Sequence, residues 1–203
     1  MERFIGFSSL LISGDPMIAV VSIGPIERSL VEGVVDSVRN YYSRFGISAE
    51  FVGEVPAEPF SVAFNVGRNQ YLGRVFLPTL SALREELGAV AILGITELDL
   101  YEEGLNFIFG LANPSLRSAI VSVHRLRNEF YGLKPDDGLL LERAVKEAMH
   151  ELGHVFGLKH CPNPRCVMHF SNSLLDTDAK GPLYCPRCEE KLEENLRKLG
   201  VLS

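Results

Sequence analysis

The sequence predicts one α/β domain built on a mixed, twisted β-sheet with helices packed against it. Its 203 residues amount to one domain at roughly 150 residues per domain, and 46% of them are hydrophobic. In the first hundred residues, strand-like apolar runs alternate with helical patterns, as in parallel sheets. Two strand-like segments then follow each other directly, which favours a mixed sheet. A last long helical pattern carries the candidate chemistry.

The first three predicted elements are a strand, a helix and a strand. Met17 to Ile23 is a short, β-branched apolar run that ends at a Gly-Pro pair, as a buried strand does. From Ile26 to Phe45, apolar residues recur every three or four positions, which describes one face of a backing helix. Gly46 follows as the terminator of this helix. The second strand is predicted at residues 47–52.

The middle of the chain is less regular. Residues 53–73 are rich in proline, glycine and polar side chains and predict no defined element. Pro78 at a first-turn position, with leucines at helical spacing after it, predicts a helix that Gly88 closes. Residues 89–95 are apolar throughout, so we expect this strand to be central in the sheet.

The second half predicts two strands and two helices. The strands are expected at 105–111 and 118–126. The PDDG sequence at 135–138 is a strong turn signal, and after it a helical pattern runs from Leu139 to Val155. A polar, highly charged segment, Glu189 to Leu199, predicts a terminal helix.

Composition limits the classes of partner. Twenty basic and 26 acidic residues give a net charge of −6, the wrong sign for coating a nucleic acid. The apolar stretch from Phe4 to Ile12 is about half as long as a membrane span. It also lacks the basic flank and the cleavage site of a signal peptide. We therefore expect a cytoplasmic monomer that binds neither nucleic acid nor a membrane.

One motif near the end of the last long helical pattern indicates metal binding. Residues 150–160 read HELGHVFGLKH. On a helix, His150 and His154 are four residues apart, so their imidazoles project from one face, as two ligands of a tetrahedral zinc require. Glu151 is rotated by about 100° from His150. Its carboxylate can therefore bind a zinc-bound water and take its proton as a general base.

Gly157 predicts how a third histidine reaches the same ion. A glycine can adopt a left-handed conformation, end the helix and turn the chain back, so that His160 approaches as a ligand. Three imidazoles leave one open position for water, whose pKa falls from 15.7 toward ~7. From the residue frequencies of this chain, a chance match to the motif has a probability on the order of 10⁻⁵.

All four cysteines lie after residue 160: Cys161, Cys166, Cys185 and Cys188. A disulfide framework would be expected to connect the whole chain of a small secreted protein. The C-x4-C and C-x2-C pairs resemble a closed, four-thiolate structural zinc site, which would stiffen a loop with little apolar content. Because Cys161 directly follows His160, this site would also fix the third histidine. Two disulfides, free thiols, and a site that joins Cys161 to the histidines are the alternatives.

Together these residues resemble one family, the archaemetzincins. HELGHVFGLKHC at 150–161 and CVMHFSNSLLDTDAKGPLYCPRC at 166–188 resemble its combined histidine and cysteine signature. GITELDLYEEGLNFIFGLA at 94–112 and SAIVSVHRL at 118–126 resemble its sheet segments, and RNQY at 68–71 is similar more weakly. The likeness covers roughly residues 66–188, while the first 65 residues are similar only in layout.

The resemblance implies a compact metzincin-like domain: a mixed sheet, an active-site helix below it, and zinc in a cleft between them. We expect a single domain over residues 1–203. Its first part, 1–157, would hold the sheet and helices and end with the active-site helix. Its second part, 158–203, would hold the methionine turn and the cysteine site.

The resemblance also implies the roles of individual residues. His150, His154 and His160 would bind a catalytic zinc, with Glu151 as the general base. The four cysteines would hold a second zinc, so that each chain carries two Zn²⁺ ions. Met168, eight residues past His160, matches the methionine that lies beneath the metal in metzincins.

The predicted function is zinc-dependent hydrolysis of a peptide or protein substrate. The alternative is a zinc-stabilised module that binds peptides without cleaving them. Tyr71 and Tyr184 are candidates for a hydroxyl that stabilises the oxyanion. The strand at 105–111 is a candidate edge to which an extended peptide adds. His124 is expected to be an ordinary strand residue, and His169 a structural one.

Overall fold

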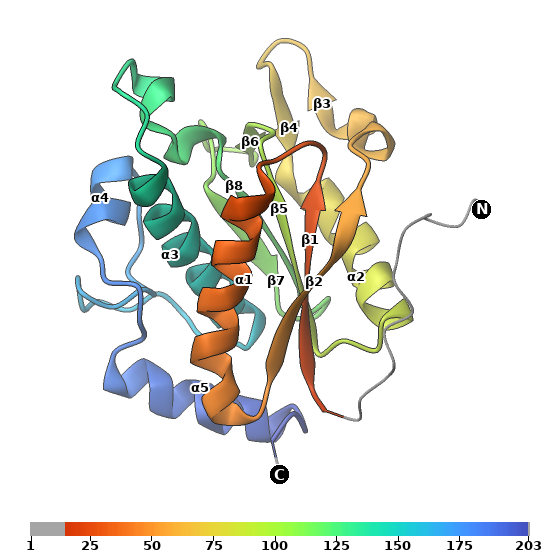
Figure 1. The fold of residues 1–203 in the computed structure, drawn as a ribbon, viewed down its shortest axis with the longest axis vertical. Coiled ribbons are helices and arrows are strands. Elements are labelled where there is room, and N and C mark those ends of the chain that lie inside the picture. Colours follow the sequence, from red (N-terminus) through yellow and green to blue (C-terminus); the bar gives the residue numbers. More distant parts are fainter. Residues whose placement is uncertain (1–14, 203) are drawn as a thin grey trace.

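A five-stranded mixed sheet is the framework of the protein in the computed structural model, which describes residues 15–202 (Figure 1). The strand order is β2-β1-β5-β8-β7, and β7 pairs antiparallel with β8 while the other neighbours are parallel. The strands are β1 (Met17–Ile23), β2 (Ser48–Val55), β5 (Ala91–Thr96), β7 (Gly110–Asn113) and β8 (Ser118–Ser122). The predicted mixed α/β fold is therefore confirmed, and β5 is central as expected.

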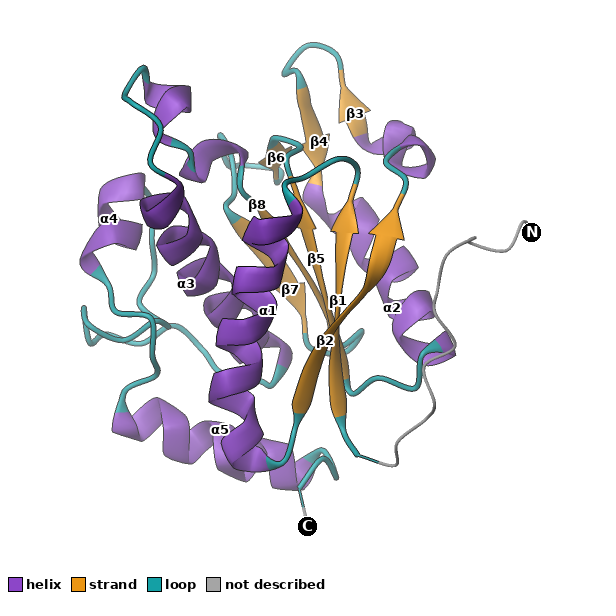
Figure 2. Cartoon of the chain, viewed as in Figure 1, coloured by secondary structure: helices purple, strands orange, loops and turns teal. Residues whose placement is uncertain are grey.

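Helices cover both faces of this sheet (Figure 2). α1 (Arg28–Tyr42) and α3 (Asp137–Val155) pack on one face, and α2 (Phe76–Glu86) packs on the other. α5 (Pro186–Lys198) lies across the end of the domain, and its Glu189 forms an ion pair with Arg44. The sheet is thus enclosed between two helical layers.

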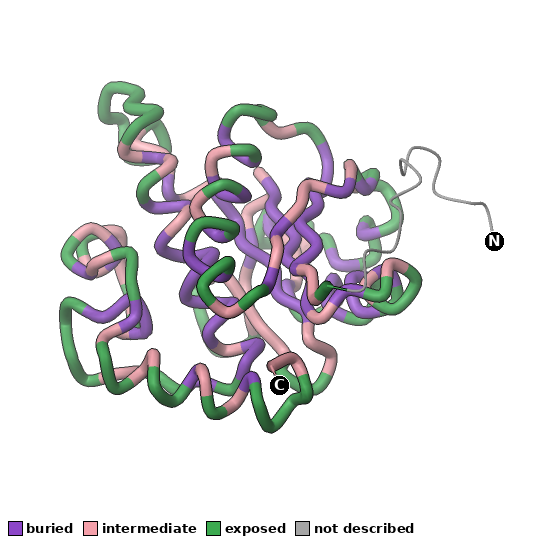
Figure 3. The backbone as a smooth tube through the Cα atoms, turned by 60° about the horizontal axis from the view of Figure 1, so that its bottom comes forward, coloured by how far each residue is buried: buried purple, intermediate pink, exposed green. Residues whose placement is uncertain are grey.

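The burial of β1 shows why both faces need a cover. Ile18 and Val20 belong to the core under α1 and α3, whereas Ala19 and Val21 belong to the core under α2. Successive side chains of a strand point to opposite faces, so a strand that is apolar throughout must be buried on both sides. Figure 3 shows the buried residues concentrated in the sheet and on the inner sides of the helices.

Two of the predicted strands have different bounds in the structure: β7 begins and ends later than predicted, and β8 ends earlier. In the segment predicted at 105–111, only Gly110 and Leu111 belong to β7, and Ile108 makes a single bridge to Leu100. β8 stops at Ser122, because its hydroxyl bonds to the carbonyl of Leu98 and accepts the N–H of His124. His124 therefore lies in a 3₁₀ turn (His124–Leu126) and is not a strand residue.

Several short elements had no prediction. A second sheet joins β3 (Phe64–Asn65), β4 (Gln70–Leu72) and β6 (Leu100–Tyr101). α4 (Leu174–Ala179) follows the methionine turn, and a capping box at Ser173 starts it. Strands of two or three residues show no alternation, and one helical turn shows no periodicity, so the sequence cannot reveal them.

The stretch from Phe4 to Ile12 lies outside the described residues. Over residues 15–202, no helix has both the length and the apolar character needed to span a bilayer.

Candidate active site and metal centres

α3 is the element that carries most of the site. Its N-cap Asp136 accepts a hydrogen bond from the N–H of Leu139 at 2.9 Å, in the turn that the sequence predicts. The helix packs on β7, β8 and α1. Since its last turns are buried on the sheet, the side chains of His150 and Glu151 have fixed positions beside the edge strand.

The end of α3 turns the chain back toward the site. Gly157 has a φ of +84°, and its N–H bonds to the carbonyl of His154 at 2.9 Å. The N–H of Leu158 bonds to the carbonyl of Gly153 at 2.8 Å, which completes a Schellman motif. The reversal brings His160 to the other two histidines, as Gly157 leads one to expect.

Three imidazoles converge after this reversal. One nitrogen each from His150, His154 and His160 lies within 4.8 Å of the others. Nδ1 of His150 donates to the carbonyl of Val167 at 2.7 Å, and Nδ1 of His154 donates to the carbonyl of Leu158 at 2.8 Å. Because a carbonyl oxygen can only accept, both Nδ1 atoms carry the proton. Both Nε2 atoms are therefore unprotonated.

This arrangement fits a divalent metal ion. The bare Nε2 atoms of His150 and His154 are 3.0 Å apart, and two facing lone pairs at that distance need a cation between them. A tetrahedral zinc with Zn–N bonds near 2.0–2.1 Å would separate two ligand nitrogens by about 3.3 Å. Burial, with smaller effects from Lys180 and His154, lowers the pKa of His150 to about 2. Burial also lowers the pKa of His154 and His160, so all three imidazoles are held neutral, as metal ligands must be.

Glu151 lies beside the histidines in a dry position. Only 6% of its surface is exposed. Burial and the nearby charge of Glu147 raise the pKa of Glu151 to about 8, against a smaller opposing effect of Lys180. A carboxyl group with a pKa close to neutral pH is present in both its ionised and its protonated form, so it can accept a proton and return it.

A buried ion pair below the cleft was not predicted. Nζ of Lys180 lies 3.0 Å from Oε1 of Glu147, and the hydroxyl of Thr177 donates to the same oxygen at 3.0 Å. All three residues are buried. Lys180 offsets the charge of Glu147 one turn before Glu151. The sequence around Lys180 resembles an ordinary polar loop, so it gave no signal of this contact.

Met168 lies beneath the histidines. It is fully buried, and a Cβ added at Gly153 would meet its Sδ at 2.4 Å. The side chain thus packs directly on the helix between His150 and His154. The residue before it, Val167, supplies the carbonyl that orients His150. The methionine turn therefore acts on the site through packing and through one backbone hydrogen bond.

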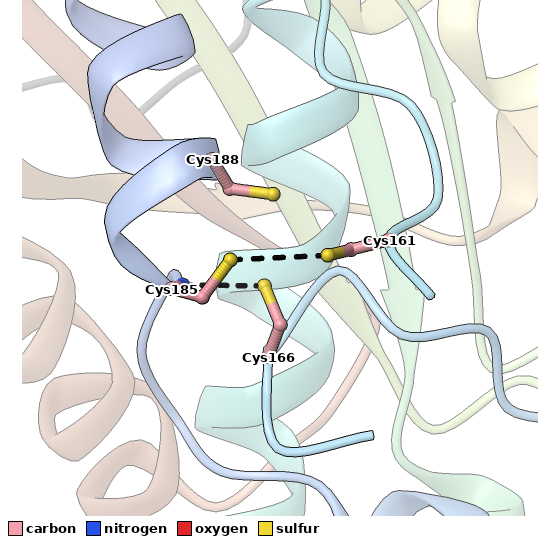
Figure 4. Close-up of side chains that lie close together, drawn as sticks. All are labelled: Cys161, Cys166, Cys185 and Cys188. Atoms are coloured by element: carbon pink, nitrogen blue, oxygen red, sulfur yellow. Dashed lines mark hydrogen bonds between the residues drawn. The ribbon is translucent and has the colours of Figure 1, made fainter. Parts of the chain in front are cut away.

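The four cysteines form a second cluster, shown in Figure 4. Their sulfurs lie within 4.8 Å of one another, and those of Cys161 and Cys185 are 3.8 Å apart. All four are free thiols. The N–H of Cys185 donates to Sγ of Cys166 at 3.3 Å. The structure groups Cys161 with the other cysteines and not with the histidines.

The cysteine cluster also fits zinc. A tetrahedral site with Zn–S bonds near 2.3 Å would separate its sulfurs by about 3.8 Å. Burial works against ionisation of Cys185, but hydrogen bonds from the backbone of Cys188 and from neighbouring thiols lower its pKa to about 7. Cys185 is the N-cap of α5, where the helix dipole also favours a thiolate.

A cleft of about 690 Å³ opens in front of the histidines. One wall is the segment 104–112, which includes the start of β7, and the other is formed by 157–160 and 170–172. Glu147, His150, Glu151 and His154 form its floor. The ring of Phe170 packs on His160, with centroids 4.8 Å apart. The histidine cluster is therefore open to a groove, whereas no cysteine lines it.

Comparison with known proteins identifies the family of this chain. The model of peptidase family M54 matches residues 16–194. The chain belongs to peptidase family M54. An archaemetzincin from Pyrococcus furiosus is 55% identical over 180 residues, which cover 89% of this chain and 94% of that protein.

Solved structures of similar proteins share the fold of this M54 chain. The crystal structure of an archaemetzincin from Methanopyrus kandleri has a TM-score of 0.78 and 39% identity, over 93% of this chain and 99% of that chain. A zinc-dependent peptidase from Methanocorpusculum labreanum has a TM-score of 0.76 and 34% identity, over 86% of this chain and 99% of that chain.

Neither tyrosine proposed for the oxyanion faces the cleft of this M54 peptidase. The hydroxyl of Tyr184 donates to the carbonyl of Met149 at 2.5 Å and lies 2.9 Å from that of Tyr42, inside the core. Tyr71 lies in β4 and packs against Phe76 and Phe64. Neither candidate therefore lines the cleft. The residue type alone does not show whether a tyrosine in an irregular segment points into the core or into the cleft.

His169 has the structural position expected of it. Its Nδ1 donates to the carbonyl of Cys161 at 2.9 Å. The N–H of Cys161 in turn bonds to the carbonyl of Met168 at 2.9 Å. These two bonds connect the methionine turn to the first cysteine.

Proposed function

We propose that the chain hydrolyses peptide bonds in peptide or protein substrates as a zinc-dependent metallopeptidase of the metzincin type. The HExxHxxGxxH motif would supply the zinc ligands His150, His154 and His160, and the general base Glu151. One observation carries the proposal: two bare Nε2 atoms 3.0 Å apart lie next to a buried carboxyl group on the floor of an open cleft. Membership of a peptidase family supports the reaction class.

Glu151 performs the proton transfers in this mechanism. A zinc ion held by His150, His154 and His160 would polarise the scissile carbonyl and lower the pKa of water. Glu151 accepts a proton from the attacking water and delivers it to the amide nitrogen, whose bond to carbon then breaks. The dry position of Glu151 keeps the carboxyl group from being solvated between these two steps. The carbonyls of Val167 and Leu158 hold the rings of His150 and His154 throughout.

The free edge of β7 is the docking strand for the substrate. The N–H of Ser122 bonds to the carbonyl of Phe109 at 2.8 Å, and Gly110 is paired with Val121. In an antiparallel pair, hydrogen-bonded and non-hydrogen-bonded positions alternate. The N–H and C=O groups of Gly110 and Ala112 therefore face away from β8, toward the open edge. An extended peptide can add there as a further strand.

A second, structural zinc at the four cysteines completes the proposal. It would hold the segment 158–203 as a subdomain below the cleft, with 1–157 above it. Thiolate ligands must stay reduced, which fits a cytoplasmic location. We propose a monomer, because the cleft and both clusters are formed within one chain.

Glu151→Gln tests the mechanism. The variant keeps the shape of the side chain and all three histidines, so zinc content should equal that of the parent. Turnover on a peptide library should fall by roughly 10²–10⁴-fold, the contribution of a general base. Equal turnover in parent and variant would contradict the mechanism. A parent that is fully loaded with zinc and retains peptides without cleaving them would instead indicate a binding module.

A further inference from the structure

At Gly110, the edge strand β7 comes very close to the side chain of Glu151. A Cβ built on Gly110 would lie 2.6 Å from Cγ, 2.7 Å from Oε1 and 2.9 Å from Cδ of Glu151. Real Cβ atoms essentially never come closer than 3.0 Å to a heavy atom outside their own residue and its two chain neighbours. The end of the Glu151 side chain therefore occupies the space that any other residue at position 110 would fill.

The backbone does not require glycine at this position. Eight glycines of residues 15–202 have positive φ angles, and Gly110 is not among them. Gly110 pairs with Val121 in regular β-structure, which any L-residue can adopt. The three nearest atoms to its virtual Cβ all belong to Glu151. Glycine is thus required at position 110 because the side chain of Glu151 occupies the adjacent space.

The backbone groups of Gly110 point toward the substrate edge, and its Cβ direction points toward Glu151. Its N–H and C=O lie in the plane of the sheet and point to the open edge, where the substrate strand would pair. Its missing side chain would point out of that plane, onto α3 and Glu151. A peptide that pairs with the backbone of Gly110 would therefore lie next to the carboxyl group of Glu151.

We propose that Gly110 is a positioning residue for hydrolysis: its lack of a side chain lets Glu151 lie against the strand edge that the substrate uses. This inference rests on the proposed function. A methyl group at position 110 would push the carboxyl group of Glu151 away from the edge. It would leave the backbone groups of Gly110 and the three histidines in place.

The kinetic test is Gly110→Ala with purified, zinc-loaded protein and a cleaved reporter peptide. We expect kcat to fall by at least ~10²-fold, as for misplacement of a general base, while KM and zinc content stay within about twofold of the parent. The double variant Gly110→Ala/Glu151→Gln should be no slower than Glu151→Gln alone, because both changes remove the same function. An unchanged kcat, or losses that multiply in the double variant, would overturn the proposal.

Gly33→Ala is the matched control. Its added Cβ would lie 2.8 Å from Cδ1 of Leu141, so it crowds a flexible side-chain tip to a similar degree. Gly33 lies in α1 and does not line the cleft. We expect kcat to remain that of the parent. A loss of kcat equal to that of Gly110→Ala would show that crowding alone reduces turnover, and would also overturn the proposal.

A stability test does not depend on peptidase activity. In chelator-treated protein, Gly110→Ala should lower Tm by roughly 2–4 °C or more, since overpacking a filled position is unfavourable. In a Glu151→Ala background the crowding atoms are gone, so the same change should leave Tm within about 1 °C. Equal Tm shifts in the two backgrounds would show that Gly110 and Glu151 are not in contact and would overturn the proposal. If these shifts differ as expected but the parent cleaves no peptide, the proposed function fails and the contact stands.

Discussion

The histidine cluster and the cysteine cluster are neighbours in the chain but are constructed differently. His150 and His154 come from the last turns of one buried helix, and backbone carbonyls hold both rings. The cysteines come from a loop and from the start of α5, and their sulfurs lie within 4.8 Å of one another. Only the histidine cluster opens on the cleft. A catalytic metal site needs an open coordination position and ligands on a rigid element. A structural metal site needs all its coordination positions filled by protein ligands.

The two clusters also differ in how the protein holds their ligands ready. Burial keeps the imidazoles neutral, and the lowered pKa of His150, about 2, shows how strongly. At the cysteine cluster, hydrogen bonds and the helix terminus favour ionisation of Cys185, whereas burial raises the pKa of Cys166 and of Cys188. A neutral donor suits an ion that must keep its charge for catalysis. Thiolates neutralise their ion and make it a structural link.

The largest expected effect is the loss of zinc and of turnover when only the histidine cluster is removed. In His150→Ala/His154→Ala, zinc measured by elemental analysis should fall from about two ions per chain to about one. Turnover should fall by ~10³-fold or more, because the water and the carbonyl are no longer activated. The far-UV circular dichroism should be that of the parent. Loss of both ions would contradict the independence of the two clusters.

Cys166→Ser should act in the opposite way, mainly on stability. Zinc binding to structural sites contributes about 10–16 kcal/mol in small zinc peptides, so we expect a loss of at least about 5 kcal/mol in unfolding free energy. Denaturant melts would measure it. Turnover at 25 °C should fall by about 10–100-fold through the third histidine, as when outer partners of a metal ligand are removed. If this variant is as stable as the parent, the cysteines do not hold a structural ion.

A smaller effect concerns the carboxyl group of Glu151 in chelator-treated protein. Its pKa rises from 4.5 to about 8 on folding. Such a group contributes stability below pH 4.5, and this contribution is lost as pH rises toward 8. The stability advantage of Glu151→Gln over the parent should therefore grow by about 2–3 kcal/mol between pH 5 and pH 7. Melting curves at several pH values would measure it, and a constant difference would contradict the buried position.

Much of the fold and of the site follows from local patterns in the sequence. β1 is predicted to the residue, because an apolar run bounded by Gly-Pro has one interpretation. The histidine motif gives its own geometry, since helix spacing aligns His150 with His154 and Gly157 ends the helix. These are interactions between residues close in the chain.

What the sequence could not reveal depends on contacts between distant segments. Gly110 touches Glu151 only because β7 pairs with β8 and α3 packs across both. Lys180 reaches Glu147 only after the methionine turn has folded back. Tyr184 was one of two candidates for stabilising the oxyanion, yet its hydroxyl bonds to the carbonyl of Met149 in the core. Residue type alone does not determine such pairings.

His160 and Cys161 are consecutive residues, so a change in the cysteine cluster would act directly on a residue of the histidine cluster. The sulfur of Cys161 is 3.8 Å from that of Cys185, close enough for an oxidant to join them after a small movement. Such a bond would pull on the peptide link to His160 and withdraw an imidazole without modifying it.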